Sequence, residues 1–275
     1  MKRRERTTAV AVGLLAASYN VAVNRVLSPK THVPANIAFA AATCAIGRTA
    51  ARLSWSDLGL GRPEAGSGFR LGAKWSLVSA ALVVATAVAP RTRRFFADER
   101  ILRTSRGEAV YEVCVRIPLA TALPEEVVFR GLLLSVLSRS HTTATAIAWT
   151  SALFGLWHVL PTLDTVRTNP MKDVLPKGRL GYAAAAGATM PATAAAGVLF
   201  ALLRNRSRSV VAPFMVHTTI NATAYIGARL SDHHRTGPRS PAEGDAAARE
   251  IDRIGSERQH TAFLKQRSAA EGKSP

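Results

Sequence analysis

Two adjacent carboxylates, Glu125 and Glu126, lie with Arg130 inside an otherwise apolar run of the sequence. In a helix, Glu126 and Arg130 share one face at i and i+4, whereas Glu125 points about 100° away from Glu126. At the centre of a bilayer, each ionisable side chain costs roughly 2.5–3.5 kcal/mol. A structural ion pair explains Glu126 and Arg130 and leaves Glu125 without a partner. Glu125 is therefore the first candidate for chemistry.

Only two of the seven histidines, His158 and His217, lie in apolar runs. Phe154 precedes His158 by four residues and Asn221 follows His217 by four, so each pair shares a helix face. A lone histidine in such a run is more often a hydrogen-bonded core residue than a catalyst. Titratable side chains on three separate apolar runs instead favour one shared polar site. Phe154 is expected to wall the cavity of that site.

Glutamate, histidine and asparagine together can hydrolyse an amide. A glutamate in a low-dielectric site can act as a general base toward water. A neutral histidine can hold that water, or two histidines can bind a metal ion that acidifies it. An asparagine amide N–H can stabilise a developing oxyanion. This set of residues therefore predicts water-mediated hydrolysis of a peptide bond inside a membrane.

The composition indicates an integral membrane protein. Runs rich in Ala, Val and Leu alternate with short arginine-rich joints, and residues 1–230 hold 28 Lys and Arg against 11 Asp and Glu. A nucleic-acid-binding protein would gather its basic residues on one face with aromatic residues between them. Basic residues that flank apolar segments are typical of membrane proteins. We therefore expect the lipid bilayer as a partner and no nucleic acid.

The apolar runs predict an all-α, polytopic transmembrane bundle of about seven spans, with six to eight as the range. The first run could be a signal peptide, but an uncleaved helix is favoured because the apolar stretch continues. Pro118 and Pro124 should kink or break the fourth run. Residues 55–63 are expected to lie at the membrane interface. The predicted spans are 8–27, 33–46, 71–89, 109–137, 142–160, 180–203 and 209–226.

Three regions follow from this pattern. Residues 1–108 form N-terminal transmembrane helices with an interfacial segment, and residues 109–229 hold all the candidate site residues. Residues 230–275 are polar and charge-balanced, and we expect a disordered tail because they cannot bury enough apolar surface. The basic start favours a cytoplasmic N-terminus, but the basic joint at 91–106 opposes it, so charge leaves the orientation open.

Three motifs in order resemble those of the CPBP family, the CAAX-prenyl proteases and bacteriocin-processing enzymes also called the Abi family. The resemblance covers roughly residues 109–226 and extends to Pro124 and Gly131 beside the first motif. It implies a helical intramembrane endopeptidase. The motifs are Glu125-Glu126-x-x-x-Arg130, Phe154-x-x-x-His158 and His217-x-x-x-Asn221.

The resemblance also implies a role for each motif residue. Glu125 would activate the water, with His158 and His217 completing the centre, and Asn221 would stabilise the oxyanion. Glu126 would brace the site together with Arg130, and it counts among the predicted catalytic residues. The family is described both as metalloproteases and as metal-free glutamate enzymes. Zinc, if bound, would be held by Glu125, His158 and His217 with water as the fourth ligand; the glutamate mechanism is favoured here.

Other functions remain open at the level of sequence. Buried glutamate and histidine could relay protons in a transporter or serve a scaffold, although the sequence shows no paired repeat. A family member could also act in regulation without cleavage. For a protease, the substrate would be a peptide or protein, either a prenylated C-terminal tail or another peptide. The Ala- and Arg-rich composition suggests a bacterial plasma membrane, and the oligomeric state stays open.

Overall fold

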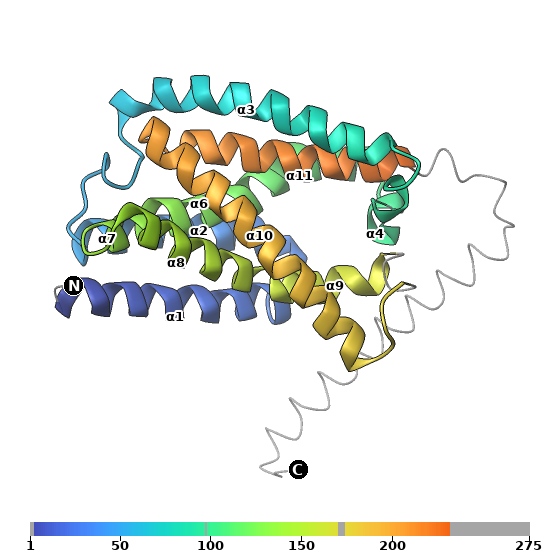
Figure 1. Cartoon of the computed structure of the whole chain (residues 1–275), viewed down its shortest axis with the longest axis horizontal. Coiled ribbons are helices and arrows are strands. Elements are labelled where there is room, and N and C mark those ends of the chain that lie inside the picture. Colours follow the sequence, from blue (N-terminus) through green and yellow to red (C-terminus); the bar gives the residue numbers. More distant parts are fainter. Residues whose placement is uncertain (1–2, 97, 170–173, 232–275) are drawn as a thin grey trace, which may run out of the picture. The chain divides into compact units, whose positions relative to one another are not determined.

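The computed structural model describes residues 3–96, 98–169 and 174–231. Residues 1–232 belong to one compact unit. Every regular element in the described ranges is helical, which confirms the all-α prediction (Figure 1). The tail that was expected to be disordered lies, from residue 232 onward, outside the described residues. The predicted boundary at residue 109 stays a prediction.

The helices follow the predicted apolar runs closely. The longer ones are α1 (Arg3–Arg25), α2 (His32–Thr49), α3 (Arg62–Val88), α8 (Thr143–Trp157), α9 (Val159–Thr168), α10 (Arg179–Ser207) and α11 (Val211–Ser231). Short 3₁₀ segments, η1 (Pro29–Thr31) and η2 (Arg93–Phe95), and the one-turn helix α4 (Glu99–Leu102) lie in the connections.

Four helical stretches are long and apolar enough to cross a membrane: Thr7–Arg25, Arg62–Val88, Thr143–Val166 and Arg179–Ser207. They correspond to the first, third, fifth and sixth predicted spans. The second, fourth and seventh predicted spans are also helical, but they do not meet the same criteria of length and hydropathy. The integral membrane assignment therefore rests on four helices, and the count of seven stays a prediction.

The fourth predicted span is one continuous helix that changes its hydrogen-bonding pattern. It consists of α5 (Arg106–Tyr111), η3 (Glu112–Ala122), α6 (Leu123–Glu126), η4 (Val127–Leu133) and α7 (Leu134–Ser138) without a gap. Both η3 and η4 are π-helices, in which the Leu123 N–H bonds to the Pro118 carbonyl and the Leu134 N–H to the Phe129 carbonyl. The predicted break does not occur, because these wider turns accommodate the prolines within the helix.

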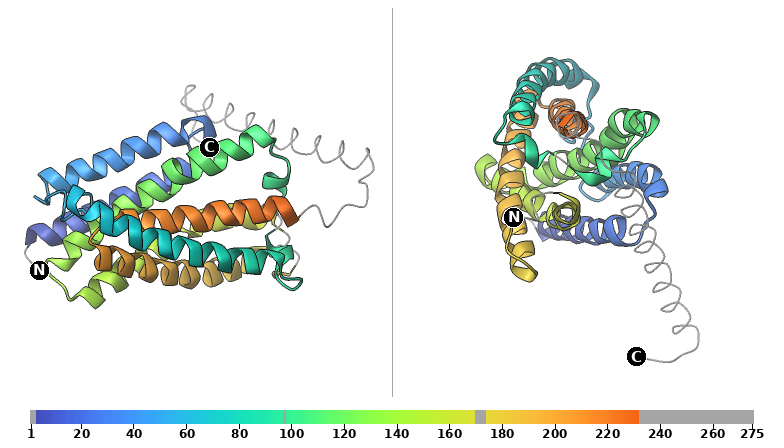
Figure 2. Two further views of the ribbon diagram at one scale, coloured as in Figure 1. Left: turned by 90° about the horizontal axis from the view of Figure 1, so that it is seen from above. Right: turned by 90° about the vertical axis from the view of Figure 1, so that its right-hand side faces the viewer.

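This continuous helix is the centre of the bundle. All seven residues of η4 are buried. The η4 segment contacts α1, α2, α8 and α10, and η3 contacts α2 and α11. One side of α11 contacts η3 of the central helix, and its other side packs along α3. The helix α11 therefore lies between α3 and the central helix (Figure 2). Residues of the central helix are therefore surrounded by elements from both ends of the chain.

Small residues let α8 and α10 approach closely. A Cβ atom on Gly155 would lie 2.6 Å from the Met190 carbonyl oxygen, and one on Gly197 would lie 3.1 Å from the Ser151 Cα. Small residues on α10 and α8 allow such close contacts between transmembrane helices. The crossing brings the C-terminal end of α8, which carries Phe154, against α10 (Figure 1).

The loop between α2 and α3 is folded onto the bundle. Leu53 and Leu58 are fully buried, whereas Trp55 is half-exposed beneath the Arg48 guanidinium. The Ser54 backbone N–H donates to the Asp57 carboxylate at 2.8 Å and lowers the pKa of Asp57, with further help from the Ser54 hydroxyl and nearby arginines. An apolar anchor and a polar turn thus fix this loop in place.

We predict that Gly155→Ala destabilises the protein by roughly 1–3 kcal/mol, because the new methyl group collides with the α10 backbone. The measurement is the melting temperature (Tm) of the purified protein in detergent. The matched control is Gly187→Ala on α10, where a Cβ atom meets nothing within 4 Å. That change should be neutral or stabilising, since alanine favours a helix over glycine by about 0.5–1 kcal/mol. Equal effects of both changes would contradict the close-packed crossing.

Candidate active site

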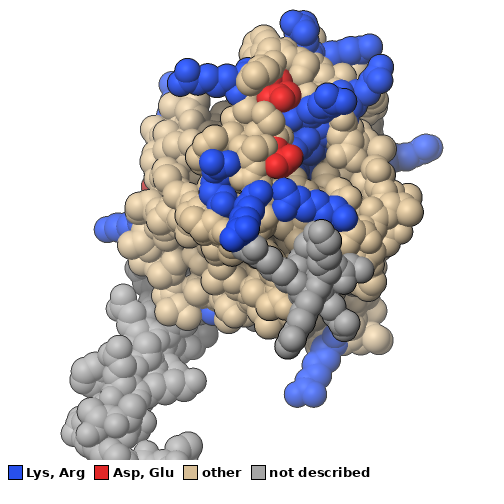
Figure 3. Space-filling view, turned by 90° about the vertical axis from the view of Figure 1, so that its left-hand side faces the viewer, with Lys and Arg blue, Asp and Glu red and all other residues tan. Residues whose placement is uncertain are grey.

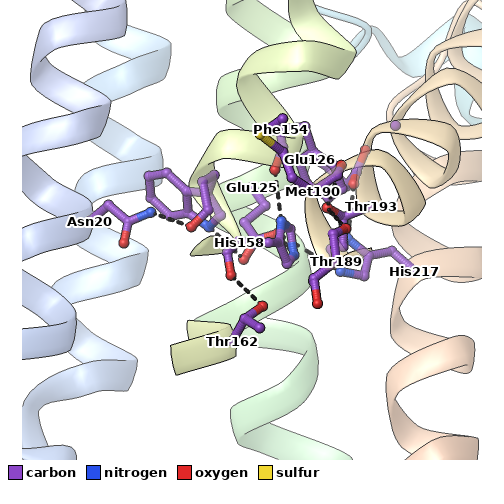
Figure 4. Close-up of polar contacts among 12 residues, drawn as sticks. Asn20, Glu125, Glu126, Phe154, His158, Thr162, Thr189, Met190, Thr193 and His217 are labelled. Atoms are coloured by element: carbon purple, nitrogen blue, oxygen red, sulfur yellow. Dashed lines mark hydrogen bonds and ion pairs between the residues drawn. The ribbon is translucent and has the colours of Figure 1, made fainter. Parts of the chain in front are cut away.

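The two glutamates occupy α6, a single α-helical turn between two π-helical segments. Both are buried: 7% of Glu125 and none of Glu126 is exposed. Figure 4 shows their side chains with those of His158 and His217, which come from the end of α8 and from α11. The structure therefore brings together Glu125, Glu126, His158 and His217, as the sequence predicted.

Glu126 accepts two contacts on one oxygen atom and, together with Arg130, links three helices. Its Oε1 accepts from Arg130 Nη1 at 3.2 Å and from His217 Nδ1 at 2.9 Å. Arg130 also donates through Nη2 to the Gly197 carbonyl of α10 at 3.2 Å. As the carboxylate partner of Arg130, Glu126 accepts in this contact, so His217 Nδ1 donates the hydrogen bond. In the neutral ring, His217 Nε2 then offers a lone pair.

Aromatic rings enclose the Arg130 guanidinium. Its central carbon lies 4.0 Å from the centroid of the Phe154 ring, 5.1 Å from that of Phe200 and 5.8 Å from that of Phe129. The ring faces attract the cation and replace part of its lost hydration. Phe200 also stacks on the His217 ring, with centroids 5.0 Å apart. Phe154 therefore supports the cation, and its role as a wall of the cavity stays a prediction.

His158 has its orientation fixed by backbone contacts. Its Nδ1 lies 2.8 Å from the Phe154 carbonyl oxygen, which can only accept, so Nδ1 carries the proton. The Thr162 hydroxyl donates to the His158 carbonyl at 2.7 Å, across the junction of α8 and α9. The second ring nitrogen, Nε2, is left to point toward Glu125. Like His217, His158 therefore presents an Nε2 lone pair to the site.

Glu125 has one oxygen that is held and one that is not. Oε1 accepts from the Trp157 indole N–H at 3.0 Å. Oε2 is buried without a hydrogen-bond partner, and it lies 3.8 Å from His158 Nε2 and 3.9 Å from His217 Nε2. These separations are too long for hydrogen bonds and suit a bridging water. Three acceptor atoms thus converge on one gap, where a water could donate to two of them.

The same three atoms were the predicted zinc ligands. Ligands at about 2.0–2.1 Å from a tetrahedral zinc lie roughly 3.3–3.4 Å from each other. The distances from Glu125 to the two histidines, 3.8 and 3.9 Å, exceed that spacing. Within residues 3–96, 98–169 and 174–231, no three His, Cys, Asp or Glu side chains lie close enough to hold a metal ion. The described arrangement does not fit zinc, and no step below is assigned to one.

Asn221 lines a cavity in whose lining the other predicted site residues do not appear. This cavity has a volume of about 480 Å³ and also contacts Thr121, Glu112 and Arg116. The structure shows no hydrogen bond from Asn221 to Glu125 or to either histidine. Asn221 and Thr121 are each four residues from a site residue, His217 and Glu125, so the cavity reaches within about one helical turn of the gap. Glu112 and Arg116 form an ion pair on the cavity wall, at 2.7 Å.

Three contacting residues were missed by the sequence reasoning: Trp157, Asn20 and Phe200. Trp157 precedes His158 within the second motif, so the sequence could have indicated an indole N–H donor near the site. Asn20 donates to the Trp157 carbonyl at 2.7 Å, and a polar residue in the first apolar run could have marked it. Phe200 gave no signal, because an apolar residue in an apolar run has many possible neighbours.

Comparison with protein families gives the class of the chain. Residues 109–223 match the family model described as type II CAAX prenyl endopeptidase Rce1-like. The match spans all three motifs and supports the assignment of the chain to the CPBP/CAAX protease family, whose activity is endopeptidase cleavage. No curated protein and no solved structure matches the chain.

We predict that Arg130→Met destabilises the protein by about 3–5 kcal/mol, because Glu126 would stay buried without its cation. The double change Glu126→Gln with Arg130→Met should recover much of that loss, since it removes both charges. The measurement is a double-mutant cycle of thermal unfolding in detergent. If the double variant is as unstable as the sum of the two single variants, the coupling between Glu126 and Arg130 is absent.

Proposed function

We propose that this protein is an intramembrane endopeptidase in which Glu125 activates water to hydrolyse a peptide bond. The observation that carries the proposal is the Oε2 atom of Glu125, buried and unpartnered, with two histidine Nε2 atoms at 3.8 and 3.9 Å. A buried acceptor without a donor is costly unless something fills the gap. A water there would be bound in the orientation needed for deprotonation.

The reaction follows from these acceptors. The water donates one proton toward Glu125 Oε2 and the other toward a histidine Nε2, which leaves an oxygen lone pair aimed at the substrate carbonyl. As the water oxygen bonds to the carbonyl carbon, Glu125 takes the first proton. When the C–N bond breaks, the same proton passes to the departing nitrogen. The products are a carboxyl group and an amine, and Glu125 returns to its charged form.

The neighbouring residues would keep this geometry. The Trp157 N–H holds Oε1 and turns Oε2 toward the gap. Glu126 holds the His217 tautomer that accepts through Nε2, and Arg130 holds Glu126. The amide of Asn221 would meet the oxyanion once substrate fills the adjoining cavity, since catalytic hydrogen bonds often tighten only in the complex.

The bilayer is the proposed source of the substrate. The family supports a CAAX-type protease, and a membrane-associated peptide or protein with a prenylated C-terminal tail is the first substrate class to test. Another membrane-bound peptide is the second class. We place the enzyme in a bacterial plasma membrane on the composition of the sequence. In the alternative function, a transporter or scaffold, the buried cluster of glutamates and histidines would relay protons or serve structure alone.

We predict that Glu125→Gln lowers kcat by about 10²–10⁴-fold, because a general base contributes roughly that factor. The assay incubates the purified protein in detergent with a panel of membrane-associated peptides that includes a prenylated Cys-a-a-X peptide. Glu108→Gln is the control, since Glu108 is an exposed glutamate on the same helix. Equal cleavage by wild type and Glu125→Gln, with both folded, would refute the role of Glu125. Loss of folding in Glu125→Gln would favour the structural role.

The same assay with and without a strong chelator tests for a metal. Cleavage that persists in chelator supports the glutamate mechanism. Loss of cleavage that zinc restores would require a metal held by Glu125, His158 and His217, and would overturn the metal-free version of the proposal.

We predict that Trp157→Phe lowers kcat by about tenfold or more with little change in KM, because a hydrogen bond to a charged group is lost. The Tm should stay close to wild type, since phenylalanine keeps an aromatic ring beside Phe129, whose ring centroid lies 5.7 Å from that of Trp157. The measurement is steady-state kinetics beside thermal unfolding. A rise in KM with kcat unchanged would show that Trp157 contacts substrate and does not position Glu125.

A further inference from the structure

One end of the bundle carries a pocket lined by arginines, away from the proposed active site. The pocket has a volume of about 420 Å³ and lies where α3 begins and α10 ends. Its charged lining residues are Arg139, Arg204, Arg208, Asp57 and Glu64. Figure 3 looks onto this end of the molecule, where Lys and Arg side chains gather around two acidic ones.

Arg204 is the unusual member of this group. It is 8% exposed, yet no carboxylate oxygen lies within 4 Å of it among the described residues. Its Nη2 donates to the Asp57 backbone carbonyl at 2.7 Å, and its Nε is buried without a hydrogen-bond partner. Arg130, the other deeply buried arginine, has Glu126 as its counter-ion. The carboxylates of Asp57 and Glu64 act on Arg204 only at longer range. Because buried charges are normally paired directly, an anion bound to the guanidinium would complete the pairing of Arg204.

The acidic residues of the pocket are already engaged. The Asp57 carboxylate accepts from the Ser54 N–H at 2.8 Å and lies 3.6 Å from Arg139 Nη2. The Glu64 carboxylate accepts from the Ser56 hydroxyl at 3.3 Å and lies in the first turn of α3, where the helix dipole favours a negative charge. Three arginines against two carboxylates leave one positive charge in excess. A ligand with a single negative charge would balance the pocket.

The position of the pocket indicates where that ligand comes from. Both α3 (Arg62–Val88) and α10 (Arg179–Ser207) are long and apolar enough to cross a membrane. Their ends at the pocket would therefore lie near the lipid headgroups. Basic pockets at this level between transmembrane helices are suited to anionic headgroups. A phosphodiester headgroup carries a single negative charge, and arginine pairs well with phosphate oxygens.

We propose that this pocket binds the phosphate group of an anionic membrane lipid, with Arg204 as its buried cation and Arg208 and Arg139 at its rim. The site is separate from the proposed protease centre and does not depend on it. A bound phosphate would be the direct counter-ion of Arg204. The hydrogen bond from Arg204 to the Asp57 carbonyl anchors the loop between α2 and α3. Lipid binding would thus stabilise the ends of α3 and α10.

The test measures the Tm of the full-length protein in non-ionic detergent. Short-chain phosphatidylglycerol is titrated in parallel with short-chain phosphatidylcholine, whose choline group cancels the phosphate charge, and with inorganic phosphate. A ligand that binds only the folded state raises the Tm in a dose-dependent way. We expect the rise with phosphatidylglycerol and much less with the other two. An equal rise with inorganic phosphate would support a phosphate site but overturn the lipid as its source. No rise with any of them would overturn the site.

Two variants that remove one charge from the same stretch give the matched comparison. Arg208→Asn removes an exposed arginine that lines the pocket, and asparagine tolerates its left-handed backbone, φ 56°. Arg206→Gln removes an exposed arginine two residues away that does not line it. We expect about a tenfold loss of apparent phosphatidylglycerol affinity in Arg208→Asn, as for one lost charge-assisted contact, and none in Arg206→Gln. Equal losses would show diffuse surface attraction and overturn the pocket.

Arg204→Met tests the buried cation itself. We expect this variant to lose the phosphatidylglycerol response. Without lipid its Tm should fall much less than that of Arg130→Met, because the change removes an unpaired charge and leaves no carboxylate stranded. A full phosphatidylglycerol response in Arg204→Met would contradict the assignment of Arg204.

Discussion

The interactions of the Glu126 carboxylate with Arg130 and His217 are the contacts on which the rest of the site depends. A charge at this depth in an apolar bundle is costly, and its cost is met here by a cation and an imidazole on the same oxygen atom, at 3.2 and 2.9 Å. Through these bonds the central helix is tied to α11, and through Arg130 also to α10. Aromatic rings then replace the hydration of the guanidinium. The network fixes the ring of His217 and so defines one side of the gap beside Glu125.

Adjacent glutamates therefore have different surroundings and can have different tasks. Glu126 accepts from a cation and an imidazole through Oε1, whereas Glu125 Oε1 accepts only from Trp157. The Oε2 atoms of both glutamates are buried without a donor, but Oε2 of Glu125 is the one that lies 3.8 and 3.9 Å from the two histidine Nε2 atoms. The helix that carries them is α-helical for only one turn, with π-helical turns on either side. Such π segments are frequent at functional sites, because the wider turn changes the direction in which side chains point. Here they let two prolines and two glutamates occupy one uninterrupted helix at the centre of the bundle.

A buried charge is stable when a counter-ion lies beside it, and the two deeply buried arginines of the described residues differ in this respect. Arg130 has a carboxylate partner within the chain, and the coupling holds the proposed active site together. Arg204 has a backbone carbonyl and no carboxylate within 4 Å among the described residues, at an end where candidate spans terminate. Arg130 thus serves the interior of the bundle, whereas in our proposal Arg204 serves the end of the bundle near the lipid headgroups. Membrane burial makes an unpaired charge informative, since it is rarely retained without a ligand or a function.

The sequence by itself determined the helical class, four of the candidate spans and residues that converge at the site, because hydropathy and i,i+4 spacing are local properties of the chain. Glu125, Glu126, Arg130, Phe154, His158 and His217 were all named from their residue types and positions, and they lie together. Only the tertiary structure decided what each atom contacts. It set the π-helical turns that keep the prolines within the helix, the Trp157 bond to Glu125, and the position of Asn221 on the adjoining cavity, apart from the histidines. These depend on distances between residues far apart in the chain, and such distances arise from helix packing that no local pattern encodes.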